Sequence, residues 1–179
     1  MKTTQILIAG FGGQGILFSG KFLAYKGLLD GIQVSWLPSY GPEMRGGTAN
    51  CNVILSDSPV GSPIITTPDV LIVMNLPSLQ KYVDSVAPGG QIYVDSSLID
   101  AKVERDDVEV FYIPATQMAK DNGIATLANM IIVGHLLENN SELSFEGIEE
   151  VVEKLVPPKK AALKDLNMKA LALGKDYKN

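Results

Sequence analysis

The fold is decided by the stretch Gln5-Ile6-Leu7-Ile8-Ala9-Gly10-Phe11-Gly12-Gly13-Gln14-Gly15. Its first part, up to Ala9, is mostly apolar without alternation, which predicts a short strand buried on both faces. The second part has the spacing G-x-G-x-x-G, and after it apolar residues recur at helical spacing until Gly27 and Gly31 mark the exit. A buried strand, a glycine-rich turn and a helix in this order predict the first βα unit of a parallel sheet.

Strands and helices continue to alternate along the chain. Apolar or alternating runs predict further strands at residues 33–37, 48–55, 70–74, 91–94 and 108–113, with Pro38 ending the first of these. Helical spacing predicts helices at residues 78–86, 124–137, 144–156 and 159–173, with Ser144 as a cap and Pro157-Pro158 between the last two. We therefore predict a three-layer α/β/α sandwich with a mainly parallel, mixed sheet and a Rossmann-like opening βα unit. It forms one domain over residues 1–179, helical from about 124 to 175.

The composition limits the possible functions. The chain has 179 residues and a net charge of −5, which suits one globular domain and is a poor electrostatic match for nucleic acid. Its only cysteine, Cys51, and its only histidine, His135, do not suffice for an iron–sulfur cluster or a tetrahedral zinc site. No apolar stretch reaches the ~20 residues of a membrane span, and the N-terminus has no leader-like run. We expect a soluble cytoplasmic protein with no metal ligands, no nucleic-acid partner and no membrane span.

The turn Gly10 to Gly15 is the first candidate binding site. Glycines there allow a tight turn and a close approach of phosphate to backbone N–H groups, and the following helix adds partial positive charge. Dinucleotide binding also needs an acid at the end of the second strand, but Asp30 precedes that strand, so ordinary NAD or FAD binding is not expected. ATP-dependent adenylating enzymes share the glycine pattern but use a similar acid. The alternative is a structural turn that binds nothing.

The second candidate is the segment from Ser39 to Gly47, which has neither strand nor helix period and predicts a polar loop at the carboxyl end of a strand. Arg45 is suited to hold a phosphate or carboxylate, Glu43 to accept from a hydroxyl or pair with Arg45, and Tyr40 to stack or donate. The alternative is that Glu43 and Arg45 form a salt bridge that stabilises a subunit contact.

Together these two motifs resemble the gamma subunit of the 2-oxoacid:ferredoxin oxidoreductases, over essentially the whole chain. The resemblance rests on Gly-x-Gly-Gly-Gln-Gly, on Ser-Tyr-Gly-Pro-Glu-Met-Arg-Gly-Gly, and on the strand that begins at Pro68. It implies a complex that converts a 2-oxoacid and coenzyme A into acyl-CoA and carbon dioxide while reducing ferredoxin. Alpha, beta and ferredoxin-like delta subunits are the implied partners, and they are expected to carry thiamine diphosphate, magnesium and the iron–sulfur clusters.

For this chain the resemblance implies a role in completing the active site and in handling coenzyme A, with no activity in isolation. It assigns no catalytic residue and no metal ligand here. The cofactor-binding candidates that it marks are Gly10, Gly12, Gly13, Gln14, Gly15, Ser39, Tyr40, Gly41, Glu43, Arg45, Gly46 and Gly47. The substrate is open among 2-oxoglutarate, pyruvate and branched-chain 2-oxoacids, with 2-oxoglutarate favoured. A stand-alone nucleotide-binding or regulatory module and the small subunit of indolepyruvate oxidoreductase are the alternatives.

Three further residues have two interpretations each. Cys51 is expected to be a small buried hydrophobic residue rather than a nucleophile, because it lies on the drier face of its strand. His135 lies in an apolar helical run and is expected to be buried rather than to act as a general base. Asp95 follows a strand, where it either faces a ligand crevice or caps the turn at Ser96-Ser97.

Overall fold

The computed structural model describes residues 3–39 and 48–178, and within these ranges the chain forms one six-stranded sheet of order β2-β3-β1-β4-β5-β6. The strands are β1 (Thr3–Phe11), β2 (Gln33–Ser39), β3 (Thr48–Ser56), β4 (Val70–Val73), β5 (Gln91–Asp95) and β6 (Glu109–Ile113). Strand β1 pairs in parallel with β4, β4 with β5, and β5 with β6, whereas β3 is antiparallel to both β1 and β2. The predicted mixed, mainly parallel sheet is confirmed.

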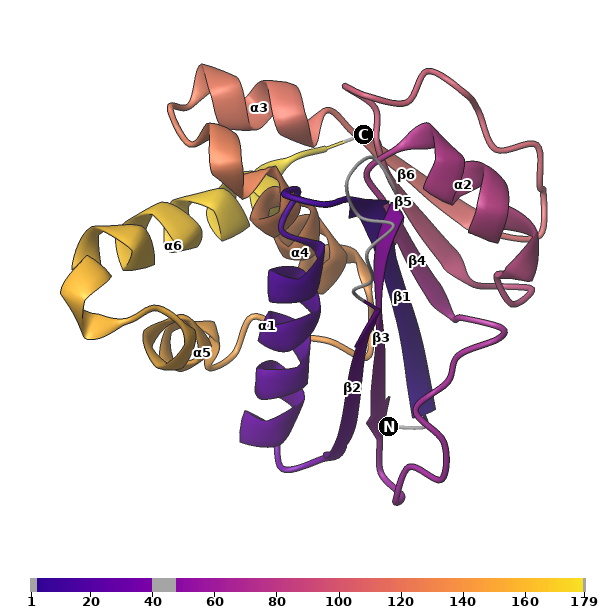
Figure 1. Cartoon of the computed structure of the whole chain (residues 1–179), viewed down its shortest axis with the longest axis horizontal. Coiled ribbons are helices and arrows are strands. Elements are labelled where there is room, and N and C mark those ends of the chain that lie inside the picture. Colours follow the sequence, from indigo (N-terminus) through magenta and orange to yellow (C-terminus); the bar gives the residue numbers. More distant parts are fainter. Residues whose placement is uncertain (1–2, 40–47, 179) are drawn as a thin grey trace.

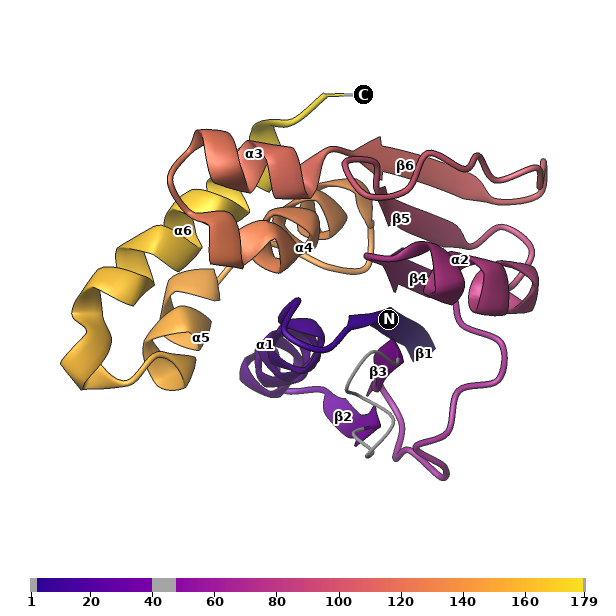
Figure 2. The ribbon, with the colours of Figure 1, turned by 45° about the horizontal axis from the view of Figure 1, so that its top comes forward.

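Helices cover both faces of this sheet, as Figures 1 and 2 show. They are α1 (Ile16–Leu29), α2 (Leu76–Tyr82), α3 (Ala115–Asp121), α4 (Ala128–Asn139), α5 (Ile148–Leu155) and α6 (Ala161–Asp176). In Figure 2, α1, α4, α5 and α6 lie on one side of the strands and α2 lies on the other. Among the helices described between residues 3 and 178, none combines the length and the apolar character that crossing a membrane requires.

The alternation of side chains along β1 divides the core into two layers. Ile6 and Ile8 belong to the apolar cluster beneath α1 and α4, while Leu7 belongs to the cluster on the face that α2 covers. Strand β4 is buried at every position, as expected for a central strand with helices on both faces. The predicted three-layer arrangement therefore follows from the period of two along the strands.

Two local predictions need correction, and one helix had not been predicted. Strand β2 does not stop at Pro38 but runs through it to Ser39, because an edge strand tolerates a residue without an N–H on its open side. Helix α5 begins at Ile148 after Gly147, whose φ of 71° is left-handed, so Ser144 is not its cap. Helix α3 was not predicted, because it has only seven residues and its apolar residues show little helical periodicity.

Candidate functional site at the carboxyl edge of the sheet

The glycine-rich turn joins the end of β1 to the start of α1 at the carboxyl edge of the parallel strands, and its shape requires glycine. Gly13 has a φ of 88° and Gly15 a φ of 77°, a region that side chains disfavour. A Cβ on Gly10 would lie 2.6 Å from Gln14 Oε1 and 2.8 Å from Ile16 Cδ1. The predicted close packing of turn, strand and helix is therefore what the glycines allow.

The side chain of Gln14 fixes the turn to the sheet. Its Oε1 accepts a hydrogen bond from the Phe11 N–H at 2.6 Å, and its Nε2 donates to the Met74 carbonyl, just after β4, at 2.9 Å. The Phe11 N–H is consequently occupied by the protein itself and is not available to a ligand. Gln14 thus holds the turn in place, while Gly12 and Gly13 remain exposed.

Asn129, at the start of α4, supports the turn from the other side. Its Nδ2 donates to the Gly15 carbonyl at 3.1 Å and to Ser19 Oγ at 3.0 Å, and only 3% of the residue is exposed. No sequence motif indicated this residue. The available signal was a single amide within the apolar run of α4, since a buried amide needs partners.

Helix α1 starts without a side-chain cap and without an acidic residue in its first turn. Its first N–H groups are therefore free of internal acceptors from side chains, and the helix dipole favours an anion there. The turn can hold a phosphate or carboxylate through the backbone. This is the only chemistry that its described atoms offer directly, because no nucleophile or general base lies within the turn.

Two hollows flank the turn, and Gly13 and Gly15 line both. One, of about 290 Å³, lies between Phe11, Phe18 and Ala49. The other, of about 270 Å³, is mainly apolar and is lined by Phe18, Thr126, Leu127, Asn129, Leu155, Val156, Pro157, Lys160, Leu163 and Asn167. Lys160 adds a cation that no sequence motif indicated.

Asn129 and Asn167, which line the second hollow, each have a buried amide oxygen without a partner among the described residues. Nδ2 of Asn129 donates to the Gly15 carbonyl and Nδ2 of Asn167 donates to the Leu163 carbonyl, which fixes the orientation of both amides. The Oδ1 atoms of both side chains then accept no hydrogen bond from any described residue. Unsatisfied buried acceptors are uncommon, and because both oxygens are fully buried they are not open to a ligand in this structure.

The second predicted motif is only partly described. Ser39 is exposed at the end of β2 and pairs with Asn50 of β3, while Tyr40, Gly41, Glu43, Arg45, Gly46 and Gly47 lie outside the described residues. Thr48, where β3 starts, pairs with Phe11 at the end of β1. The strand ends on both sides of this segment therefore lie at the same edge of the sheet as the glycine-rich turn.

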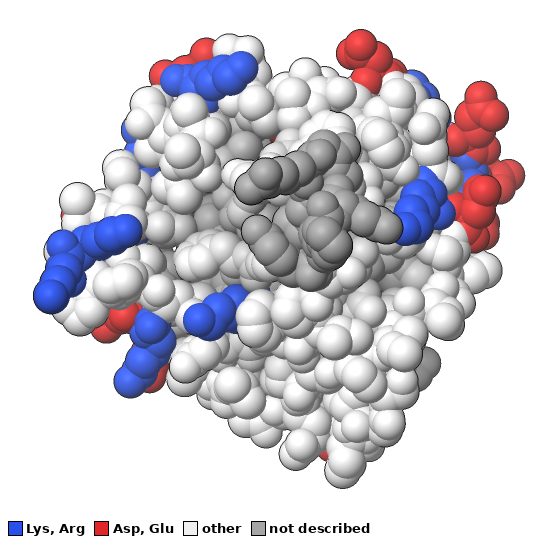
Figure 3. All heavy atoms as spheres, in the orientation of Figure 1, with Lys and Arg blue, Asp and Glu red and all other residues white. Residues whose placement is uncertain are grey.

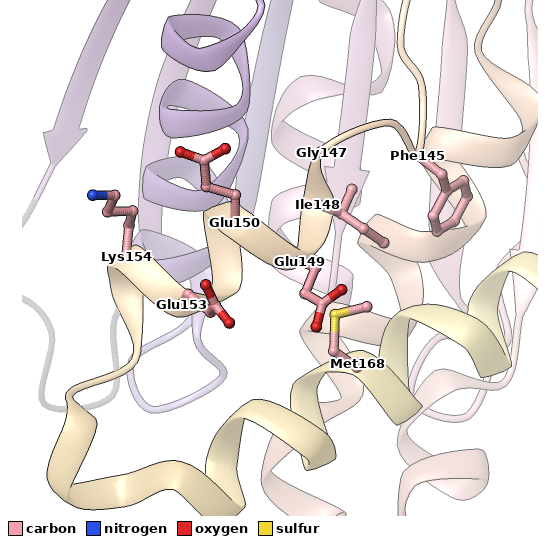
Figure 4. A pocket seen from close by; sticks show the side chains of 8 residues that line it. All are labelled: Phe145, Gly147, Ile148, Glu149, Glu150, Glu153, Lys154 and Met168. Atoms are coloured by element: carbon pink, nitrogen blue, oxygen red, sulfur yellow. The ribbon is translucent and has the colours of Figure 1, made fainter.

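The larger hollow shown in Figure 4 lies elsewhere, between α5 and α6, with a volume of about 700 Å³. Glu149 and Glu153 line it, and both form ion pairs with Lys164, at 3.0 Å and 2.5 Å. Exposed carboxylates that already have a cation do not indicate a catalytic site. We therefore place the candidate site at the glycine-rich turn.

Cys51 is fully buried, as expected. Its Sγ accepts a hydrogen bond from Trp36 Nε1 at 3.2 Å, and burial raises the pKa of the thiol to about 11 despite that bond. A thiol with this pKa is not a nucleophile near neutral pH. The expectation of a structural cysteine is confirmed.

His135 is also buried, in contact with the rings of Tyr93, Phe111 and Tyr177. Its Nδ1 lies 3.0 Å from the Gly174 carbonyl, and burial lowers its pKa below the ordinary value, an effect that this bond partly opposes. His135 therefore packs α4 against α6 and makes no hydrogen bond to the turn.

Asp95 has the capping role. Its carboxylate accepts hydrogen bonds from the Ser97 N–H at 3.1 Å and from Thr116 Oγ1 at 2.5 Å, and it is fully buried. It thus connects the end of β5 to the first turn of α3. The described residues include no group of three or more metal-ligating side chains.

Comparisons with known proteins agree with this geometry. The structure is similar to that of the gamma subunit of keto/oxoacid ferredoxin oxidoreductase from Geobacter sulfurreducens PCA. The TM-score is 0.81 and the sequence identity 30%, and the superposition covers 97% of this chain and 96% of that one. The fold is that of an oxidoreductase gamma subunit. A model of the family described as pyruvate ferredoxin/flavodoxin oxidoreductase matches residues 5–177. The chain belongs to this family.

The share of a relative's length that this chain covers differs between relatives. Ketoisovalerate oxidoreductase subunit VorA of Methanothermobacter thermautotrophicus is 38% identical over 174 residues, which are 97% of this chain but 36% of VorA. 2-Oxoglutarate synthase subunit KorC of Methanothermobacter marburgensis is 34% identical over 179 residues, covering 96% of this chain and 95% of KorC. The 2-oxoglutarate:ferredoxin oxidoreductase from Magnetococcus marinus, solved with 2-oxoglutarate, coenzyme A and succinyl-CoA bound, has a TM-score of 0.84 at 28% identity, over 98% of this chain and 31% of that one. The chain thus spans about a third of VorA and nearly all of KorC.

Proposed function

We propose that this chain is the gamma subunit of a 2-oxoacid:ferredoxin oxidoreductase complex, and that the complex acts on 2-oxoglutarate. The observation that carries the proposal is the match to KorC over nearly the full length of both chains. The match to VorA, a ketoisovalerate subunit, is slightly higher in identity but spans a much smaller share of the relative. We place the complex in the cytoplasm and treat residues 1–179 as one domain.

The overall reaction joins the acyl group of the 2-oxoacid to the thiol of coenzyme A. The bond from the carbonyl carbon to the carboxylate carbon breaks and releases carbon dioxide, a thioester forms, and a pair of electrons and a proton leave the substrates. Ferredoxin accepts the electrons. Thiamine diphosphate with magnesium and iron–sulfur clusters supply this chemistry on the alpha, beta and delta subunits, because one buried cysteine on this chain cannot hold a cluster.

This chain contributes binding and positioning. The turn Gly10 to Gly15 presents backbone N–H groups to a phosphate of coenzyme A, and the uncapped start of α1 favours its negative charge. The adjacent hollow, which is mainly apolar and has Lys160 in its lining, suits the amide-containing arm of the same molecule. Arg45 and Glu43 position the neighbouring subunit's part of the site.

The experiment is purification of the native complex through this subunit, followed by reduction of a low-potential dye with a panel of 2-oxoacids. We expect coenzyme A-dependent dye reduction that is fastest with 2-oxoglutarate and absent from the isolated chain. Fastest turnover of a branched-chain 2-oxoacid would favour the ketoisovalerate alternative. Fastest turnover of indolepyruvate would favour the indolepyruvate oxidoreductase alternative, whose subunit IorB from Archaeoglobus fulgidus is 27% identical to this chain. A monomer that binds a nucleotide and has no partners would contradict the proposal.

Substitution of Arg45 tests the role of this chain. In the reconstituted complex, Arg45→Ala is expected to raise the KM for coenzyme A roughly tenfold or more, since a charge-assisted hydrogen bond contributes about 1.5–3 kcal/mol, or to prevent assembly. Arg45→Lys keeps the charge but not the two-pronged geometry and should recover part of the loss. Lys120→Ala, at an exposed position in the last turn of α3, is the control. Unchanged kinetics in an intact Arg45→Ala complex would contradict this role.

A further inference from the structure

The sheet has one open edge. Strand β2 is the last strand on its side, and no described residue outside the sheet makes a hydrogen bond to its backbone. Trp36 is 39% exposed and Leu37 38% exposed, in a molecule whose central strands are almost completely buried. A strand in this position presents N–H and C=O groups to any extended chain that approaches it.

The sequence of β2 lacks the usual protection against such pairing. Gln33 to Ser39 contains no charged residue, whereas edge strands of soluble proteins are commonly protected by charges. Figure 3 shows the same feature on the surface, where charged side chains gather over α5, α6 and the loops beside α2 but are nearly absent from the lower middle, over β2 and the lower half of α1. Pro38 is the only protective residue, and it limits new pairing to residues 33–37.

The opposite edge of the sheet is occupied. Tyr177, after the end of α6, donates a hydrogen bond from its Oη to the Tyr112 carbonyl of β6 at 3.3 Å, and Lys102 Nζ lies 3.9 Å from the centre of the Tyr112 ring. A strand added beside β6 would have to displace Tyr177. Pairing of β2 with β6 of another copy, which would generate an open chain of molecules, is therefore disfavoured.

We propose that β2 pairs with β2 of a second copy of this chain, antiparallel and about a two-fold axis at Ser35. This register places Val34 of one copy opposite Trp36 of the other, a pairing of β-branched and aromatic side chains that stabilises antiparallel strands, and Gln33 opposite Leu37. Helix α1 packs against β2, and Leu28 and Leu29 in its last turn, 57% and 39% exposed, add further apolar surface. The absence of charge on β2 makes self-pairing free of repulsion. The inference is independent of the catalytic function.

Charge substitution at the axis tests the pairing, because only a two-fold contact brings Ser35 opposite itself. Sedimentation of the isolated chain should show a concentration-dependent dimer. Ser35→Lys alone and Ser35→Glu alone should each weaken the dimer by about tenfold or more, since like charges directly opposite repel. A mixture of the two variants should dimerise again. Ser141→Lys, at an exposed position outside β2, is the matched control and should leave the dimer unchanged.

Thermal unfolding of each variant distinguishes a loss of pairing from a loss of folding. Leu37→Lys, at a position more exposed than Ser35, is a second variant that should also weaken the dimer. A chain that stays monomeric at ~1 mM would overturn the inference, because that corresponds to less than about 4 kcal/mol of association free energy. A dimer that survives both Ser35 substitutions, or a mixture that does not recover, would overturn it too. Ser35→Lys that loses binding of another subunit while the parent is monomeric would assign the edge to that subunit instead.

Discussion

Gln14 is the residue that determines the shape of the candidate site. It was predicted as a member of a binding motif, but its two hydrogen bonds run to the turn and to Met74 rather than outward. Of the two predicted roles of this motif, the hydrogen bonds of Gln14 show the structural one, and phosphate binding stays a prediction. Gln14 stabilises the turn, and the exposed backbone of Gly12 and Gly13 is left for a ligand.

Replacing Gln14 should cost stability without removing any exposed binding group. We expect Gln14→Ala to lower the free energy of unfolding by about 1–3 kcal/mol, because the Phe11 N–H and the Met74 carbonyl lose their partners. Gln14→Glu keeps an acceptor for Phe11 but loses the donor to Met74, so its effect should be intermediate at neutral pH. Denaturant titration measures both, with the exposed Gln80→Ala as the control. Equal stability of Gln14→Ala and Gln80→Ala would show that the side chain does not hold the turn.

At the scale of elements, α4 and α6 cross with their backbones in contact. A Cβ on Gly134 would overlap the carbonyl oxygen of Leu171, and a Cβ on Gly174 would overlap that of Ile131. The neighbouring His135 then reaches the Gly174 carbonyl. Small residues at the crossing thus allow α6 to cover α4, the helix with the longest buried run in the described chain.

Gly174→Ala should therefore separate the two helices. Backbone atoms cannot move aside as a flexible side chain does, so we expect a loss of about 2–3 kcal/mol or more in the free energy of unfolding. Gly61→Ala is the control, since no atom lies within 4 Å of a Cβ there and its φ is not positive. Thermal unfolding of both variants checks this expectation. A Gly174→Ala variant as stable as the control would mean that the crossing relaxes freely.

At the scale of the whole molecule, His135 makes the stability of the fold depend on pH. Burial, mainly, lowers its pKa below the ordinary 6.5, with Lys178 acting in the same direction and the Gly174 carbonyl and Glu138 opposing. As the pH falls below about 6.5, the unfolded chain binds a proton that the folded chain does not, so stability decreases with falling pH in that window. It is the only histidine of the chain.

Substituting His135 should flatten this dependence. In His135→Phe, which keeps an aromatic ring among Tyr93, Phe111 and Tyr177, we expect the free energy of unfolding to change little between pH 7 and about 5.5. The measurement is denaturant titration at several pH values, and the slope against pH is the readout rather than the absolute stability. His135→Gln, which keeps a polar group, should show the same flat slope. Parallel pH profiles of the parent and both variants would rule out His135 as the cause.

The sequence by itself determined the parts of this protein that depend on local periodicity. The opening strand, the glycine-rich turn and α1 follow from Gln5 to Gly15, and the fully apolar residues 70–74 predicted a central strand. The burial of Cys51 also followed from alternation along its strand. Such features were predictable because backbone geometry sets the periods of strands and helices over a few residues.

Only the tertiary structure decided the features that join distant segments. Residues more than a hundred positions apart, Gly15 and Asn129, meet at the turn, and Asp95 organises α3 from the end of β5. The short helix α3 could not be predicted because its start is held by that remote carboxylate rather than by a local cap. The position of β3 between β2 and β1, and hence the open edge at β2, likewise follows from pairing across the sheet. Strand order and side-chain partners depend on which surfaces meet in the folded chain, and local periodicity does not encode that information.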